Sequence, residues 1–174
     1  MNKLGIELSY LLRHHKPYQA IISKEGYIAT SQILLDMNIV KNVLDDIVKN
    51  DPENRFEYST DKEYIRSRNG HSLDVNITYP KAEIPTDGLT VYHGTIERFY
   101  GDILRDGLKP QDRQYVHLTS NYDKAVRNAH RRKKAVPIVI EIKLLSQDLV
   151  FLASPDTYLV HYIEPTRLKE FHHV

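Results

Sequence analysis

The sequence predicts an α+β protein of two parts, and three observations support this prediction. In the first part, three segments carry apolar residues at helical spacing and are followed by two short β-rich runs. The second part mixes strands and helices without the regular alternation of a doubly wound sheet. Between them lies a segment with Pro80, Pro85 and few helix formers, which is the best linker candidate. We therefore expect one domain over residues 1–80 and a second over residues 81–174.

Composition narrows the class of protein. The chain has 174 residues, and 41% hydrophobic content suffices for a packed core. It has no cysteine, which excludes disulfides and thiolate metal sites. With 24 basic and 23 acidic residues, the total charge argues neither for nor against a nucleic-acid partner. Because no apolar run approaches membrane-spanning length and the N-terminus lacks signal-peptide features, we expect a cytoplasmic protein without a membrane partner.

The first domain begins with a predicted helix over residues 3–15, which places four leucines on one face and is stopped by Pro17. Residues 19–22 and 27–28 are expected to pair as short extended segments around a turn. Two more helices follow, one that Thr30 or Ser31 caps and one over residues 39–49. The runs 55–58 and 64–66 predict a hairpin. Helices followed by such a wing describe a winged-helix module, which commonly contacts nucleic acid.

The second domain is expected to contain strands at 91–95, 116–119, 137–143 and 149–153, with helices at 97–107 and about 121–131. Gly107 stands where a C-terminal cap would fall, and Asn121 is the expected N-cap of the second helix. The His172-His173 pair is interpreted as an exposed tail.

The first two of these strands each carry a histidine. His93 is followed by Gly94 and Thr95, and His117 is followed two residues later by Thr119. A glycine lets a ligand approach the backbone and threonine adds a hydroxyl, so the strands predict one shared cleft. Two alternatives stay open, because Gly94 also suits a strand-to-helix junction and His117 also suits a hydrogen-bonded core position.

Basic residues near these strands have ordinary interpretations too. Arg113 suits a solvated loop, and the run Arg131-Arg132-Lys133-Lys134 suits either a helix end or contact with a nucleic-acid backbone. The absence of a Gly-rich phosphate loop argues against kinases, nucleotide triphosphatases and Rossmann dehydrogenases. Adjacent histidines point in different directions and make no chelate, so no metal site is expected.

Four motifs occur in a particular order: Leu12-Arg13-His14, Ile65-Arg66-Ser67-Arg68-Asn69-Gly70-His71-Ser72, Tyr92-His93-Gly94-Thr95 and Arg113-Gln114-Tyr115-Val116-His117-Leu118-Thr119. Together they resemble the RNA 2′-phosphotransferase family over nearly the whole chain. The resemblance implies a winged-helix lobe and a C-terminal lobe similar to the ADP-ribosyltransferase fold. It also implies NAD as co-substrate, no metal, and a tRNA-like or other RNA carrying a 2′-phosphate as partner.

The resemblance implies roles for individual residues. The family's catalytic set of three arginines and a histidine falls on Arg13, His14, Arg66 and Arg113. Its NAD-binding strands match His93, Gly94, Thr95, His117 and Thr119, the last at a position where serine is more usual. Arg131 or Arg132 approximates a basic position near the substrate phosphate. Tyr115 stands where the family often has histidine, and no site is assigned to residues 154–159.

The implied reaction transfers the RNA 2′-phosphate to the nicotinamide ribose of NAD, and a transesterification then releases 2′-OH RNA and ADP-ribose 1″,2″-cyclic phosphate. Guanidinium groups suit it because they stay charged and bind phosphate oxygens bidentately. His14 is the expected general acid or base. We expect a monomer with the active site between the lobes. The alternatives are an ADP-ribosyltransferase that modifies a protein or a nucleic-acid terminal phosphate, and a binding protein without catalysis.

Overall fold

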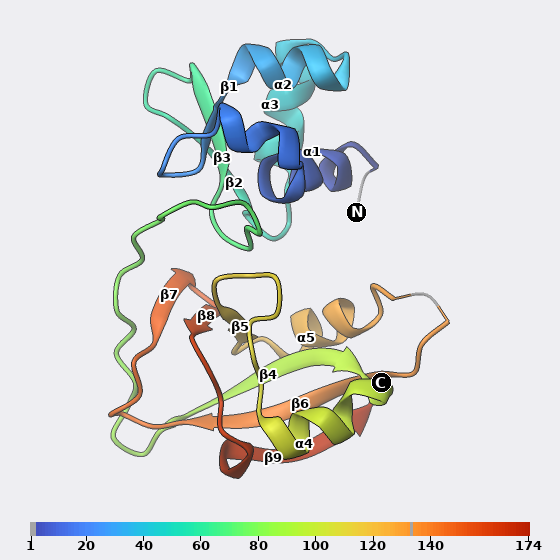
Figure 1. The fold of residues 1–174 in the computed structure, drawn as a ribbon, viewed down its shortest axis with the longest axis vertical. Coiled ribbons are helices and arrows are strands. Elements are labelled where there is room, and N and C mark those ends of the chain that lie inside the picture. The colour runs from blue at the N-terminus through green and yellow to red at the C-terminus, as the bar shows by residue number, and fades with distance from the viewer. Residues whose placement is uncertain (1–2, 133) are drawn as a thin grey trace. The chain divides into compact units, whose positions relative to one another are not determined.

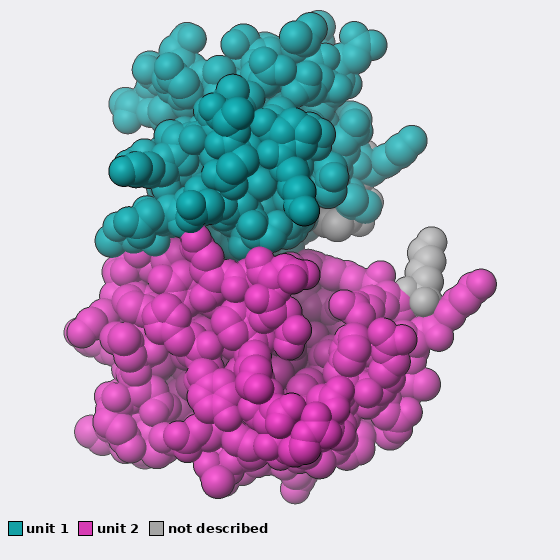
Figure 2. All heavy atoms as spheres, in the orientation of Figure 1, with its two compact units in different colours: residues 1–78 teal, residues 79–174 magenta. Residues whose placement is uncertain are grey.

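The computed structural model describes residues 3–132 and 134–174 as a mixed α and β protein with antiparallel sheets (Figure 1). The chain separates into two compact units, one ending at Thr78 and the other beginning at Tyr79 (Figure 2). In the described part of the chain, no helix combines the length and the apolar character needed to cross a bilayer.

The first unit packs three helices with a small sheet. The helices are α1 (Lys3–His14), α2 (Thr30–Met37) and α3 (Lys41–Lys49). The strands are β1 (Tyr27–Ala29), β2 (Phe56–Tyr58) and β3 (Tyr64–Ser67), antiparallel in the order β1-β3-β2. The predicted leucine face of α1 forms part of the core, because Leu8 and Leu12 are fully buried. Apolar residues of the other elements are fully buried as well, namely Ile33, Leu44 and Ile65.

Two local predictions for this unit are wrong. Residues 19–22 are not an extended segment, because Lys16–Ala20 forms a 3₁₀ helix, η1, in whose first turn Pro17 already has a helical φ. Strand β1 pairs with β3 instead, with Tyr27 opposite Arg66. Thr30 is the first residue of α2 and not its N-cap, and its hydroxyl donates to the Lys62 carbonyl at 2.9 Å.

The second unit is built on a six-stranded antiparallel sheet with the order β7-β8-β5-β4-β6-β9. The strands are β4 (Leu89–Ile96), β5 (Val116–Thr119), β6 (Pro137–Leu144), β7 (Phe151–Ser154), β8 (Thr157–Val160) and β9 (Leu168–His173). The helices are α4 (Tyr100–Asp106) and α5 (Tyr122–Ala129), with 3₁₀ turns η2 (Glu97–Phe99) and η3 (Pro165–Arg167).

The two helices of this unit cover opposite faces of the sheet (Figure 1). On one face, Ile103 of α4 belongs to the buried cluster that contains Val91 of β4. On the other face, α5 packs against Gly94, which is three residues further along β4 and so points the other way. A Cβ on Gly94 would lie 2.0 Å from the Ala125 carbonyl oxygen. Only glycine therefore allows α5 to approach β4 this closely.

The ends of the second unit differ from the prediction more than its middle. Strands β8 and β9 were not predicted, and β9 overturns the interpretation of His172-His173 as a tail, since both residues pair with β6. Both side chains are nevertheless exposed, as polar residues on an edge strand often are. The predicted caps are confirmed. Gly107 follows α4 with a φ of 76°, and the Asn121 side chain accepts the Lys124 backbone N–H at 3.0 Å.

Candidate functional site

Arg13 and His14 end α1, and the loop that follows β3 is bonded to this helix end. The Arg13 carbonyl oxygen accepts the backbone N–H groups of Ser72 at 3.0 Å and Leu73 at 3.2 Å. These bonds satisfy a carbonyl that the end of a helix leaves without an intrahelical partner. They also attach the first predicted catalytic pair to the loop that begins next to Arg66.

The Arg13 side chain lies in a socket formed by the same loop. It is 7% exposed, and its Nε donates to the Ser67 hydroxyl at 2.6 Å. The guanidinium lies against Gly70, where φ is +85° and an added Cβ would come within 3.3 Å of Cζ. Glycine is needed here both for its backbone conformation and for the space it leaves. The socket therefore fixes the direction in which the guanidinium points.

His14 is held by the other end of the loop. Its half-buried ring has Nδ1 at 2.9 Å from the Ser72 hydroxyl. That hydroxyl also lies 3.4 Å from the Arg13 carbonyl oxygen. One serine therefore contacts both members of the Arg13-His14 pair.

Arg66 lies on β3 and is oriented by three groups. Its Nε donates to Glu57 at 2.6 Å, one Nη donates to the Glu25 carbonyl at 2.9 Å, and its guanidinium carbon lies 4.6 Å from the centre of the Tyr27 ring. Glu57 also pairs with Arg68 at 2.6 Å. Arg66 is thus a partly neutralised guanidinium that is held in one orientation.

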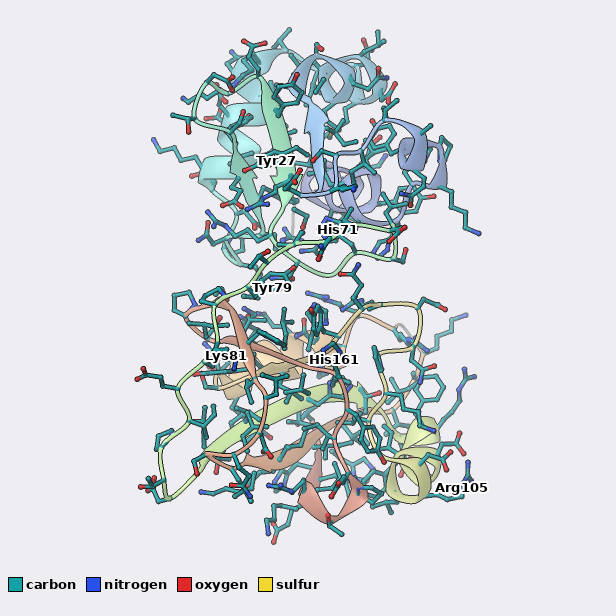
Figure 3. The ribbon with its side chains drawn as sticks, turned by 60° about the vertical axis from the view of Figure 1, so that its left-hand side comes forward. Tyr27, His71, Tyr79, Lys81, Arg105 and His161 are labelled. Carbon is teal, nitrogen blue, oxygen red and sulfur yellow. The ribbon has the colours of Figure 1, made fainter. Side chains whose placement is uncertain are left out.

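His71 is buried beside these cationic groups. It is 3% exposed, and in the described structure its buried Nε2 has no hydrogen-bond partner. Burial lowers the pKa of His71 to about 3, and positive charge on Arg13, His14 and Arg66 adds to the effect. The ring is therefore neutral near pH 7. Figure 3 shows His71 in the loop after β3 and Tyr27 on β1.

Three of the four predicted catalytic residues, Arg13, His14 and Arg66, lie in the first unit, and each is near enough to His71 for its charge to lower the His71 pKa. Two forked cations and an imidazole are the groups that bind a phosphate ester and transfer a proton to or from it. Sequence reasoning missed the residues that orient them, Glu57, Ser67 and Ser72. The only signal was that both serines lie in the motif that contains Arg66.

In the second unit, β4 and β5 are neighbours, but their ladder is short. In the described register one pair joins them, Tyr92 opposite Thr119, whereas β4 pairs with β6 from Leu89 to Ile96. The edge of β4 beyond Tyr92 therefore diverges from β5. Backbone groups on such an edge are able to bind a ligand that carries amide or hydroxyl groups.

The two histidines meet at this divergence. His93 Nδ1 lies 3.0 Å from the His117 carbonyl oxygen, and burial lowers the pKa of His93, which keeps its ring neutral. Because side chains alternate along a strand and Tyr92 is opposite Thr119, His117 shares the face of Tyr92, while His93 points to the other face. The prediction that both side chains face one cleft is therefore wrong. The contact joins a ring to a backbone carbonyl.

Two predicted NAD-binding residues also have packing roles. Gly94 admits α5, which supports the geometric alternative for this glycine. Thr119 is 4% exposed, and its hydroxyl accepts the Asn121 backbone N–H at 3.1 Å, which holds the turn into α5. Contact of NAD with these residues, and with Thr95, stays a prediction.

Arg113 and Tyr115 precede β5. Arg113 lies in an exposed loop, and its action together with Arg13 and Arg66 stays a prediction. The Tyr115 ring packs against His161, with 4.8 Å between ring centres, and against Tyr79 at 5.9 Å. Figure 3 labels His161 and Tyr79. Aromatic packing therefore accounts for the tyrosine at this position without an acid–base role.

Arg131 and Arg132 follow α5 and are exposed, as a solvated helix end would be. The guanidinium carbon of Arg132 lies 4.9 Å from the centre of the Phe99 ring, in a cation–π contact. Lys133 lies outside the described residues. Contact of this segment with a substrate phosphate stays a prediction. Within residues 3–132 and 134–174, no group of three histidine or acidic side chains is arranged to hold a metal ion.

Comparison with known proteins gives matches over most of the chain. The model of a family described as RNA 2′-phosphotransferase, Tpt1 / KptA family, matches residues 1–161. A protein named probable RNA 2′-phosphotransferase from Pectobacterium atrosepticum is 38% identical over 146 residues, which covers 80% of this chain and 78% of the relative. A protein of the same name from Thermococcus kodakarensis is 29% identical over 167 residues, covering 91% and 90%. Another, from Acaryochloris marina, is 32% identical over 141 residues, covering 78% and 75%.

Proposed function

Because the chain belongs to the RNA 2′-phosphotransferase, Tpt1 / KptA, family, we propose that it is a transferase that removes an internal 2′-phosphate from RNA and passes it to NAD. NAD is a substrate in this reaction, consumed once per turnover. We further propose that the first unit is a winged-helix lobe and that the second is an ADP-ribosyltransferase-like lobe. Cytoplasmic location and a monomeric state remain expectations.

The observation that carries the proposal is the set formed by Arg13 and His14 at the end of α1 and Arg66 on β3, whose positive charges all act on His71. Arg13 is nearly buried yet held by a neutral serine, with a glycine beneath its guanidinium. A guanidinium held in one orientation presents its N–H groups as a fork that matches the oxygens of a phosphate ester. His71 is neutral and adds no positive charge of its own. These properties support binding of a phosphate ester.

In the first proposed step, an oxygen of the RNA 2′-phosphate attacks the anomeric carbon of the nicotinamide ribose, the glycosidic bond to nicotinamide breaks, and nicotinamide leaves as a neutral molecule. NAD would lie along the diverging edge of β4, next to His93 and Thr95. The residues present fit such a ligand, because a strand edge offers backbone N–H and C=O groups to a carboxamide and to ribose hydroxyls.

In the second proposed step, the 2″-hydroxyl of the attached ADP-ribose attacks the same phosphorus and the RNA 2′-oxygen leaves. Negative charge then lies on the non-bridging oxygens, where Arg13 and Arg66 would stabilise it. A role for Arg113 in this step stays a prediction. His14 would transfer the proton that the attacking hydroxyl loses or the leaving RNA oxygen gains. The products are 2′-OH RNA and ADP-ribose 1″,2″-cyclic phosphate.

Incubation of the purified protein with NAD and a short RNA that bears one internal 2′-phosphate tests this function, with products weighed by mass spectrometry. We expect nicotinamide, cyclic phosphate and RNA lighter by one phosphate. The matched control is the same RNA with a 2′-hydroxyl, which should consume no NAD. A stable ADP-ribose adduct on a protein or on a terminal phosphate would instead indicate an ADP-ribosyltransferase. Unchanged NAD would indicate a binding protein.

A further inference from the structure

We propose that Ser72 is a positioning residue for His14, whose hydroxyl keeps a proton on Nδ1 and so makes Nε2 the nitrogen that exchanges a proton with the substrate. This inference rests on the proposed role of His14 in phosphate transfer. It is carried by the contacts of one side chain. The Ser72 hydroxyl lies 2.9 Å from His14 Nδ1 and 3.4 Å from the Arg13 carbonyl oxygen.

The direction of these bonds follows from the groups available. A carbonyl oxygen accepts and never donates, so the serine is the donor in its contact with Arg13. A hydroxyl has one proton, and when that proton points to the carbonyl, its lone pairs remain for Nδ1–H of His14. Donation from His14 Nδ1 to Ser72 Oγ, and from Ser72 to the Arg13 carbonyl, is the order in which both contacts are hydrogen bonds.

The same direction is the one that tolerates both protonation states of the histidine. A protonated imidazole donates from both nitrogens, so a partner that donates to Nδ1 would have to turn whenever the ring gains a proton. An accepting Ser72 stays in place. With Nδ1 occupied, a neutral ring has its lone pair on Nε2, and a charged ring has its second proton there. A single nitrogen then serves as base or as acid.

The backbone holds the serine where this contact requires it. Its own N–H donates to the Arg13 carbonyl at 3.0 Å. The side chain of the next residue, Leu73, is 4% exposed. The backbone N–H of Asp74, one residue further, donates to the Gln19 side chain at 2.8 Å. Bonds on both sides therefore fix the position of Ser72, and removing its hydroxyl should leave the loop in place.

The tautomer of His14 is measurable by nitrogen-15 NMR of the full chain, without substrates. We expect neutral His14 to carry its proton on Nδ1 in the wild type and in Ser72→Thr. In Ser72→Ala it should move toward the Nε2-protonated form that free imidazole side chains prefer. Ser31→Ala removes an exposed hydroxyl on α2 and is the matched control, in which the tautomer should not change. An Nε2-protonated His14 in the wild type would overturn the proposal.

Steady-state kinetics supply a second readout. Ser72→Ala should slow the turnover rate about five- to tenfold, the effect of losing one hydrogen bond, with little change in the KM for RNA, and Ser72→Thr should recover it. An equal loss in Ser72→Thr, or a loss confined to KM, would contradict a positioning role. If the wild type releases no cyclic phosphate, the proposed function fails, whereas the tautomer measurement still decides the role of Ser72.

Discussion

The buried, neutral His71 should make the first unit less stable in mild acid. Folding encloses this imidazole among cationic groups, at 3% exposure, and its pKa falls from the ordinary value of 6.5 to about 3. The unfolded chain takes up a proton below pH 6.5, whereas the folded chain does not until near pH 3. The unfolded state therefore gains stability as the pH falls through this window, and the folded state is favoured in full only above it.

The size of the effect follows from the two pKa values. Each pH unit within the window lowers the free energy of unfolding by about 1.4 kcal/mol. Between pH 7 and pH 5, where the unfolded histidine passes from mostly neutral to mostly charged, the loss is about 2 kcal/mol. That loss is a sizeable fraction of the 5–15 kcal/mol of stability, roughly, that is typical of a domain.

Urea unfolding of the full chain at the two pH values, followed through amide signals of buried residues in the first unit such as Ile65, measures this loss. His71→Phe should abolish about 2 kcal/mol of the pH dependence, since its ring cannot take up a proton. His172→Phe, the same exchange at an exposed site, should retain it. The reasoning is refuted if the His71 ring titrates near pH 6.5 in the folded chain, or if His71→Phe depends on pH as the wild type does.

Three further predictions concern glycines and arginines. Gly94→Ala places a methyl group 2.0 Å from the Ala125 carbonyl oxygen, and thermal unfolding should show a loss of about 3 kcal/mol or more in the free energy of unfolding. Gly101→Ala, at an exposed position of α4 where nothing lies within 4 Å, is the control and should raise the free energy of unfolding by up to about 1 kcal/mol. Similar melting temperatures for the two variants would contradict the packing of α5. Gly70→Ala strains a φ of +85° and presses on Arg13, so turnover should fall more than NAD affinity does, and an unchanged rate would show that the socket is not needed. Arg13→Ala and Arg66→Ala should each slow the second step about a hundredfold or more, so that ADP-ribosylated RNA accumulates, and the corresponding lysine variants should recover little of the rate. A quenched time course measures this, and a wild-type product pattern would show that neither residue belongs to the site.

The sequence by itself determined the elements whose patterns are local. The leucine spacing of α1, the caps at Gly107 and Asn121, and the hairpin of β2 and β3 follow from periodicity and turn chemistry within short windows, and all are present in the structure. The order of four motifs was also legible, because it needs no spatial information. It led to the family that the comparisons show.

Only the tertiary structure decided which side chains orient the candidate site. Ser72 reaches His14 across 58 positions of sequence, and Ser67 reaches Arg13 across 54. The pairing of Glu57 with Arg66 requires the register of β2 on β3, and the closeness of Gly94 to α5 requires a helix that begins 28 residues later. Such contacts depend on how separated segments pack, and the local propensities from which a sequence is interpreted do not specify them.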